Sequence, residues 1–404
     1  MMHHWRHTSR LCLILVLGGL LLSGCWDRNE INDLAIVLAT GVDYTDEQIQ
    51  LTAQIFLPRK GEGTQSGSGG GSGGGSGGSN PSGVTITRTA KGETAAEAMN
   101  RLQRRISREL FWGHCEVIVI SEQAGKHGLR EYIDFFLRYP QFREHAFVFS
   151  SKGQAKSILE MLDPLERSSA ESLREMANLS LGSRVTLLEL ARSIEGTSRS
   201  AILSQLLVAS SNREDIGQQE NTPLMKGMSL YKNDKYAVTV TEPRSVGVLL
   251  LANQLNDIIL PVTLPSYKGT ISILLTEAQT IIRPRIAGQE WSARILVKAK
   301  GDVVLNTTDA DLSKPAVQAE LREAWTNKLK ELAEDALQLS QHEVKADLFH
   351  ISDRFHRHYP KKWKSRQQEW EAILQNMEIQ VDTEAVVKRI GKSTNPQGKS
   401  GSKK

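Results

Sequence analysis

Cysteine is scarce in this sequence, which contains three cysteines among 404 residues, at positions 12, 25 and 115. So few thiols exclude a disulfide framework of the kind that holds many small secreted domains together. A chain of this length can instead bury two or three hydrophobic cores. Cys115 lies beside an apolar run at 117–120, and we predict that it is a small buried hydrophobic residue.

A large excess of charge is also missing, because 50 basic residues face 46 acidic ones and the formal net charge is +4. This balance provides no reason to propose nucleic acid as a partner. Catalytic motifs are missing as well: the sequence has no Gly-x-Ser-x-Gly, and no helix follows the glycine run that matches Gly-x-Gly-x-x-Gly. The triplet Gly391-Lys392-Ser393 lacks the upstream glycines of a phosphate-binding loop. We therefore predict that the protein is not an enzyme.

A metal site is weakly indicated by a group of histidines and aspartates near the C-terminus. The group comprises His342, Asp347, His350, Asp353, His356 and His358. Its spacing matches no common zinc ligand set, and residues 356 and 358 point to different faces of a helix. A solvated helix surface is the favoured interpretation, and we predict no metal.

The strongly apolar stretch at 11–24 is shorter than the ~20 residues that a membrane-spanning helix needs. It carries no charge, and residues 1–10 before it carry Arg6 and Arg10 but no acid. A positive segment followed by a short apolar one is typical of a secretory signal peptide, predicted here over 1–24. Its removal would lower the net charge from +4 to +2, by the two arginines.

The signal ends in a lipobox-like sequence, Leu21-Leu22-Ser23-Gly24-Cys25. Small residues before the cysteine suit a peptidase that cuts between Gly24 and Cys25. We predict that the Cys25 thiol then carries a diacylglycerol, with or without an additional N-acyl chain, and that the chain needs no other cofactor. Two acyl chains anchor a protein stably, so it would lie on the outer face of a membrane. An incidental cysteine or an uncleaved anchor is the less favoured alternative.

Five segments are predicted from the pattern of strands, helices and breaks. They are a signal peptide at 1–24, an α/β domain at 25–210, a linker at 211–223, an α+β region at 224–391 and a disordered tail at 392–404. Strands alternate with helices in the α/β domain, which predicts mixed sheets, partly parallel and flanked by helices. Residues 61–83 are almost wholly Gly and Ser, which predicts a flexible loop inside that domain. The α+β region is compatible with one unit or two subdomains.

Three local patterns make sharper predictions. A helix is expected to begin after Thr94 and to bury the face formed by Ala98, Leu102, Ile106 and Leu110. Asn233-Asp234 predicts a hairpin turn at the start of the second region. Trp363 and Trp370 stand seven apart and are expected on one face of a helix that follows the break at Tyr359-Pro360.

Four arginines fall outside the buried face of the helix predicted after Thr94, at positions 101, 104, 105 and 108. A solvated basic face is the favoured interpretation. Contact with anionic lipid headgroups or with an acidic partner is the alternative.

The residues after the cysteine, Cys25-Trp26-Asp27-Arg28-Asn29-Glu30-Ile31-Asn32-Asp33-Leu34-Ala35, resemble the mature N-terminus of the Ger(x)C lipoproteins. These are the C subunits of bacterial spore germinant receptors. Further similar segments are Gly41-Val42-Asp43, Gly92-Glu93-Thr94, Phe111-Trp112-Gly113-His114, Asp134-Phe135-Phe136-Leu137-Arg138 and Tyr359-Pro360 with Trp363. The resemblance covers nearly all of 25–391.

The resemblance implies a non-enzymatic subunit of a receptor in the spore inner membrane. Family members act with two integral membrane partners, the A and B subunits, and the receptor triggers germination when nutrients bind. Five residues beside the anchor are candidates for contact with the membrane or a partner: Trp26, Asp27, Glu30, Ile31 and Asp33. The alternative function is a solute-binding lipoprotein of an ABC importer, which would need two α/β lobes around a cleft.

Overall fold

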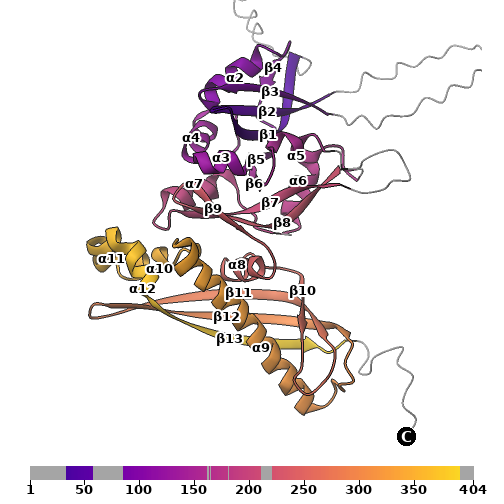
Figure 1. The fold of residues 1–404 in the computed structure, drawn as a ribbon, viewed down its shortest axis with the longest axis vertical. Coiled ribbons are helices and arrows are strands. Elements are labelled where there is room, and N and C mark those ends of the chain that lie inside the picture. The colour runs from indigo at the N-terminus through magenta and orange to yellow at the C-terminus, as the bar shows by residue number, and fades with distance from the viewer. Residues whose placement is uncertain are drawn as a thin grey trace, which may run out of the picture.

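The computed structural model describes residues 33–57, 85–161, 163, 165–180, 182–210 and 221–391. Two β-sheets follow one another along the long axis of the molecule (Figure 1). The first sheet lies at one end with the N-terminal elements, and the second lies at the other end with the C-terminal elements. No helix among the described residues is both long enough and apolar enough to cross a membrane.

The first sheet is mixed and has its parallel strands in the middle. Its strands are β1 (Leu34–Thr45), β2 (Gln48–Phe56), β3 (Thr85–Gly92), β4 (Glu109–Phe111), β5 (Val117–Ser121), β6 (Phe147–Ser151), β7 (Ser200–Ser210), β8 (Asn221–Lys232) and β9 (Lys235–Val240). The order is β3-β2-β1-β5-β6-β7-β8-β9, with β4 paired to the start of β1. Strands β1, β5, β6 and β7 are parallel neighbours, and antiparallel strands flank them on both sides. This confirms the predicted α/β class.

Helices cover both faces of this sheet. They are α2 (Ala95–Gln103), α3 (Glu122–His127), α4 (Arg130–Arg138), α5 (Ala155–Leu159), α6 (Ser169–Asn178) and α7 (Leu187–Glu195). One core joins β1, β2 and β5 to side chains of α2, α4 and α7, such as Leu102, Phe136 and Leu190. A second core on the other face holds Leu159 of α5 and Leu173 of α6. Burial on both faces explains why β5 is apolar almost throughout.

The second sheet is covered on one side and open on the other. Its strands are β10 (Ile258–Val262), β11 (Ile271–Ala287), β12 (Glu290–Asn306) and β13 (Glu378–Arg389), in that order. The accompanying helices are α8 (Arg244–Leu251), α9 (Pro315–Gln338), η2 (Leu339–Val344), α10 (Ile351–His358), α11 (Pro360–Arg366), η3 (Gln367–Glu369) and α12 (Trp370–Asn376). Buried and exposed residues alternate along β12, as expected for a half-buried strand. Cross-strand ion pairs such as Lys300–Glu277 line the exposed side.

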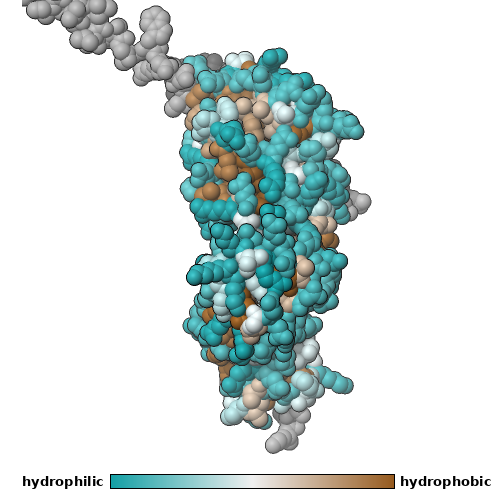
Figure 2. Space-filling model, turned by 90° about the vertical axis from the view of Figure 1, so that its left-hand side faces the viewer, coloured by the Kyte–Doolittle hydropathy of each residue, from teal (hydrophilic) through white to brown (hydrophobic). Residues whose placement is uncertain are grey.

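Hydrophilic side chains cover most of the face shown in Figure 2, and hydrophobic ones form separate patches. Beneath the surface, a single core crosses from one sheet to the other. Ile202 of β7 and Leu230 of β8 belong to the same buried cluster as Leu250 of α8 and Ile273 of β11. The two sheets are therefore packed together.

The division between the two sheets does not coincide with the predicted linker. The hairpin around Asn233 forms as predicted, but its strands β8 and β9 extend the first sheet. The sheets therefore change after Val240 and not at the predicted linker, 211–223. Residues 211–220 of that linker, the loop at 61–83 and the tail at 392–404 lie outside the described residues. Local periodicity identified the strands but could not tell which sheet they would join.

The helix that begins after Thr94 is shorter than the sequence predicts. It ends at Gln103, and Leu110 lies in the short strand β4, although Leu110 is buried as expected. The amide of Gln103 accepts from Leu110 N at 2.9 Å and donates to Arg108 O at 2.8 Å. Residues 109–111 pair with β1 as the strand β4, and they do not continue the helix.

The prediction for the two tryptophans changes in detail. Trp363 and Trp370 are both buried and meet edge to face with ring centroids 5.2 Å apart. They lie on separate short helices, α11 and α12, because the chain turns through η3 between them.

Gly247 provides a test of the packing between α8 and α9. A Cβ atom at this position would lie 2.1 Å from the Leu332 carbonyl oxygen, closer than any real contact. We expect Gly247→Ala to lower the free energy of unfolding by about 1–3 kcal/mol, because overpacking forces the two helices apart. Urea unfolding followed by tryptophan fluorescence measures this change. Gly153→Ala is the control, since no atom lies within 4 Å of its added Cβ; equal losses in both variants would contradict the prediction.

Candidate functional site: the cleft between the two sheets

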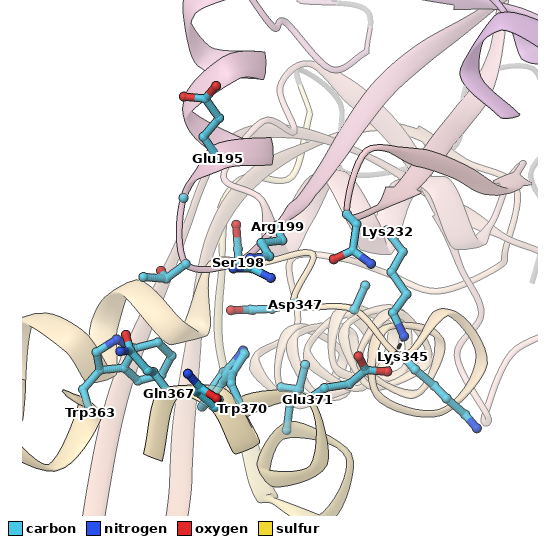
Figure 3. Close-up of a pocket in the computed structure, with 16 residues that line it drawn as sticks. Glu195, Ser198, Arg199, Lys232, Lys345, Asp347, Trp363, Gln367, Trp370 and Glu371 are labelled. Carbon is cyan, nitrogen blue, oxygen red and sulfur yellow. Dashed lines mark hydrogen bonds and ion pairs between the residues drawn. The ribbon is translucent and has the colours of Figure 1, made fainter. Parts of the chain in front are cut away.

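A hollow with a volume of about 720 Å³ lies where the two sheets meet. The first sheet contributes the turn at 195–199 before β7 and the Lys232-Asn233 corner of the β8–β9 hairpin. The second region contributes the turn at 345–347 and residues of α11, η3 and α12 (Figure 3). The cleft is therefore built by segments that are far apart in the sequence.

Asp347 is the central polar residue of this cleft. Its carboxylate is buried and accepts hydrogen bonds from the backbone N–H groups of Ile351 and Ser352, both at 2.8 Å, at the start of α10. Its carbonyl oxygen accepts a hydrogen bond at 2.6 Å from the hydroxyl of Ser200, the first residue of β7. Asp347 thus satisfies the exposed N–H groups of a helix end and connects that helix to the first sheet.

Two further side-chain contacts span the junction. Thr197 hydrogen-bonds the Ser352 hydroxyl at 3.1 Å and also donates to the Asp353 carboxylate. Lys232 forms an ion pair with Glu371, seen as the dashed line in Figure 3. Because the Glu371 side chain is 55% exposed, this ion pair adds little stability.

Backbone strain is concentrated at the same junction. Among the described residues, nine that are not glycine have a positive φ. Three of them line the cleft, Arg199 (φ 47°), Asn233 (60°) and Lys345 (55°), and a fourth, His350 (54°), directly precedes α10. Asparagine tolerates this conformation, but for the other three it costs roughly 1 kcal/mol each. The surrounding contacts therefore hold the turns in a conformation that their own sequences do not favour.

An aromatic cluster forms one wall of the cleft. Trp370 packs against Trp363, and both contact Trp291 of β12 at ring-centroid distances below 6.5 Å. The Trp370 indole N–H is buried and has no hydrogen-bond partner among the described residues. Buried tryptophan N–H groups usually find one. This wall is therefore mainly apolar, and the Trp370 indole N–H is a buried donor without a partner among the described residues.

The described residues contain no group of three or more His, Cys, Asp or Glu side chains that could hold a metal ion. Two members of the histidine and aspartate group at 342–358 make contacts within the protein. Asp347 accepts hydrogen bonds at the start of α10, and His358 lies 2.9 Å from the Arg354 carbonyl oxygen, within hydrogen-bond distance. The Nδ1 atom of His350 lies 3.6 Å from the carboxylate of Asp353. The polar side chains of the cleft form hydrogen bonds between the first sheet and the second region.

Most of the predicted site residues lie outside the described residues. These are Gly24, Cys25, Trp26, Asp27, Glu30 and Ile31. Asp33 is described: it is exposed and comes directly before β1. Cys115 is completely buried, as predicted, and its Sγ lies 3.3 Å from the Thr40 hydroxyl.

Sequence reasoning missed the junction itself. It noted Asp347 as a possible ligand, although an acidic residue shortly before a helix is also a capping signal. Ser200 and Thr197 carried no signal, because their partners lie about 150 positions away and only the packing of the sheets brings them together.

Two family models match the chain and together cover most of it. The first, "Spore germination protein N-terminal domain", matches residues 27–208. The second, "Spore germination B3/ GerAC like, C-terminal", matches residues 226–391. The gap between the two matches, at 209–225, falls inside the first sheet, at the end of β7 and the start of β8.

Curated proteins of Bacillus subtilis (strain 168) are similar over almost their whole length. The "Putative spore germination protein YfkR" is 27% identical, with 93% of this chain and 95% of that protein covered. "Spore germination protein KC" is 24% identical, with 96% and 97% covered. "Spore germination protein A3" is 23% identical, with 94% and 97% covered.

A solved structure shares the fold. The crystal structure of the GerBC protein superposes with a TM-score of 0.55 and 16% sequence identity, covering 87% of this chain and 97% of that one. This agreement confirms the predicted fold class, an α/β region followed by an α+β region with mixed sheets flanked by helices.

The pH dependence of stability tests the environment of Asp347. Burial raises the pKa of its carboxyl, and the hydrogen bonds from Ser352 and Ile351 only partly oppose this effect. The stability that this group contributes is therefore full below its unfolded pKa of ~3.9 and is lost as the pH rises through the folded pKa. We expect the wild type to lose stability relative to Asp347→Asn as the pH is raised from acid toward neutrality, measured by urea unfolding at each pH.

Asp311→Asn is the matched control. Ser313 donates hydrogen bonds that lower the Asp311 pKa, so the wild type should gain stability relative to this variant as the pH rises. Parallel curves for the two variants would contradict the assignment.

The thiol of Cys115 should be unreactive in the folded protein. Burial raises its pKa to about 12, and only the thiolate attacks a maleimide. In residues 25–404 carrying Cys25→Ser, we expect no labelling under native conditions and complete labelling in urea, read by intact mass. Fast native labelling would show that the core around β5 opens readily.

Proposed function

Because the chain belongs to the GerAC-like family of spore germination proteins, we propose that it is the lipid-anchored C subunit of a germinant receptor. In this role it is needed for nutrient-triggered germination. The observation that carries the proposal is the match of both family models, in order, from residue 27 to residue 391. A chain similar to its relatives over both regions is expected to act as a whole subunit.

The anchor in this proposal is a diacylated Cys25. The positive segment, the short apolar stretch and the small residues before the cysteine support it independently. Two acyl chains would hold the protein at the membrane without a spanning helix. The protein would then lie on the outer face of the spore inner membrane.

The partners in this proposal are the two integral membrane subunits, A and B. The chain would contribute by assembling or stabilising the receptor, and it would not act as an enzyme. The cleft supports an assembly role in one respect: hydrogen bonds of Ser200 and Thr197 and the ion pair of Lys232 connect the first sheet to the second region across the junction. A rigid pair of sheets is a suitable platform for partner subunits.

The alternative, a solute-binding lipoprotein, rests on the cleft between the sheets. It needs two α/β lobes joined by crossover strands. The second region instead has an antiparallel β10–β11–β12 meander and a long helix, and β8 and β9 do not cross into it. The fold therefore favours the receptor subunit.

The proposed function is tested in spores of the organism that carries this gene. Deleting the gene should abolish the response to at least one nutrient set, measured as release of the spore-core solute, while a non-nutrient trigger still works. Cys25→Ala should reproduce the loss and release the protein from the membrane fraction. Cys115→Ala is the matched control, because it removes a thiol without touching the anchor.

The proposal would be wrong if deletion left every nutrient response unchanged with the other receptor genes also deleted. A ligand-induced rise in the thermal stability of the purified protein would then favour the solute-binding alternative.

A further inference from the structure

The described chain begins at one end of the molecule. Leu34, the first residue of β1, pairs with Glu109 of β4. In Figure 1, β4 and α2 lie at the end of the molecule that is opposite to the second sheet. The chain between Cys25 and Asp33 spans at most ~30 Å when fully extended. A lipid at Cys25 would therefore keep this end close to the bilayer.

The same end carries an exposed basic loop. Helix α2 runs away from the end of β3 at Gly92, and the chain then passes through Arg104, Arg105 and Arg108 before it enters β4. All three arginines are exposed. The backbone of this loop is fixed by the Gln103 amide, which bonds to Arg108 O and Leu110 N. The arginines are thus presented by an ordered loop.

Two of these arginines are free to bind something else. Arg105 donates to the Thr89 carbonyl at 2.9 Å, whereas Arg104 and Arg108 form no ion pair within the described part of the chain. The nearby acids, Asp33 and Glu109, are exposed as well. Arg104 lies at the C-terminal end of α2, where a positive charge interacts favourably with the helix dipole. This interaction does not explain Arg108, which lies beyond that helix.

Apolar side chains are exposed at this end too. Phe56 and Leu57, at the end of β2, are 36% and 41% exposed. Because β2 runs antiparallel to β1 and Ile55 pairs with Val37, they lie beside the start of β1. Arginine together with exposed Phe and Leu is the composition of surfaces that settle into the interfacial zone of a bilayer.

We propose that this end of the molecule, defined by Phe56, Leu57, Arg104 and Arg108, is a membrane-docking surface that binds the headgroups of anionic phospholipids. The inference rests on the proposed lipid anchor, which supplies proximity. The basic loop then supplies orientation: β1 and β4 face the lipid, and the second sheet and the cleft point away from it. The long axis of the molecule would then point away from the membrane, with the first sheet near the lipid and the second sheet farther out.

The test measures binding to lipid without the anchor. Residues 25–404 with Cys25→Ser are mixed with sedimentable vesicles of equal parts phosphatidylglycerol and phosphatidylcholine, or of phosphatidylcholine alone. We expect binding to the anionic vesicles only, weakening as salt is added because exposed charges are screened. Arg104→Glu with Arg108→Glu should lower the partition coefficient about tenfold or more, since each basic residue near such a surface contributes about fivefold.

Lys361→Glu with Lys364→Glu is the matched control. Both lysines are exposed on α11, in the second region, and the change in net charge is the same. This variant should bind as the wild type does. Circular dichroism and the unfolding midpoint show that each variant is folded.

Each outcome separates this inference from the proposed function. Equal losses in both double variants would mean that net charge alone drives binding, and no binding by the wild type would mean that the surface is wrong. Either result overturns the docking surface. The anchor would still stand if Cys25→Ala abolished germination, because that experiment does not depend on the arginines.

Discussion

Burial of apolar side chains from both sheets in one continuous core is the constraint on which the rest of the structure depends. Ile202 and Leu230 of the first sheet share this core with Leu250 and Ile273 of the second region. Each such side chain contributes about 1.5–3 kcal/mol when fully buried, whereas an exposed ion pair such as Lys232–Glu371 contributes about 0–1. The core therefore holds the sheets together, and the polar contacts set how they meet.

The polar contacts at the junction determine orientation because they are specific in geometry. Asp347 caps α10 with its carboxylate and receives Ser200 with its carbonyl, so a shift of either sheet would leave buried groups unpaired. The left-handed turns at Arg199 and Lys345 persist only in this arrangement. A subunit built in this way would present its surfaces to partners as a nearly fixed body.

The proposed anchor would lie at one end of the molecule, and the junction between the sheets lies in the middle. The start of β1 lies at the end that carries the arginine loop, and the second sheet lies at the other end. The open face of that sheet carries cross-strand ion pairs such as Lys300–Glu277 and is exposed to solvent. Under the proposed function, one end of the molecule would face the membrane and the other would project from it, an arrangement that suits assembly with the proposed A and B subunits.

The sequence by itself determined the class of each region, the buried Cys115 and the family, because hydrophobic periodicity and short motifs are local properties. It also predicts the signal and the lipid at Cys25, in residues that the structure does not describe. Only the tertiary structure decided that β8 and β9 complete the first sheet, that Leu110 belongs to a strand, and that Asp347 joins the sheets. The partners of Leu110 and Asp347 lie far away in the chain, and β8 and β9 join the first sheet through their neighbour β7, so pairing in the tertiary structure outweighed local pattern.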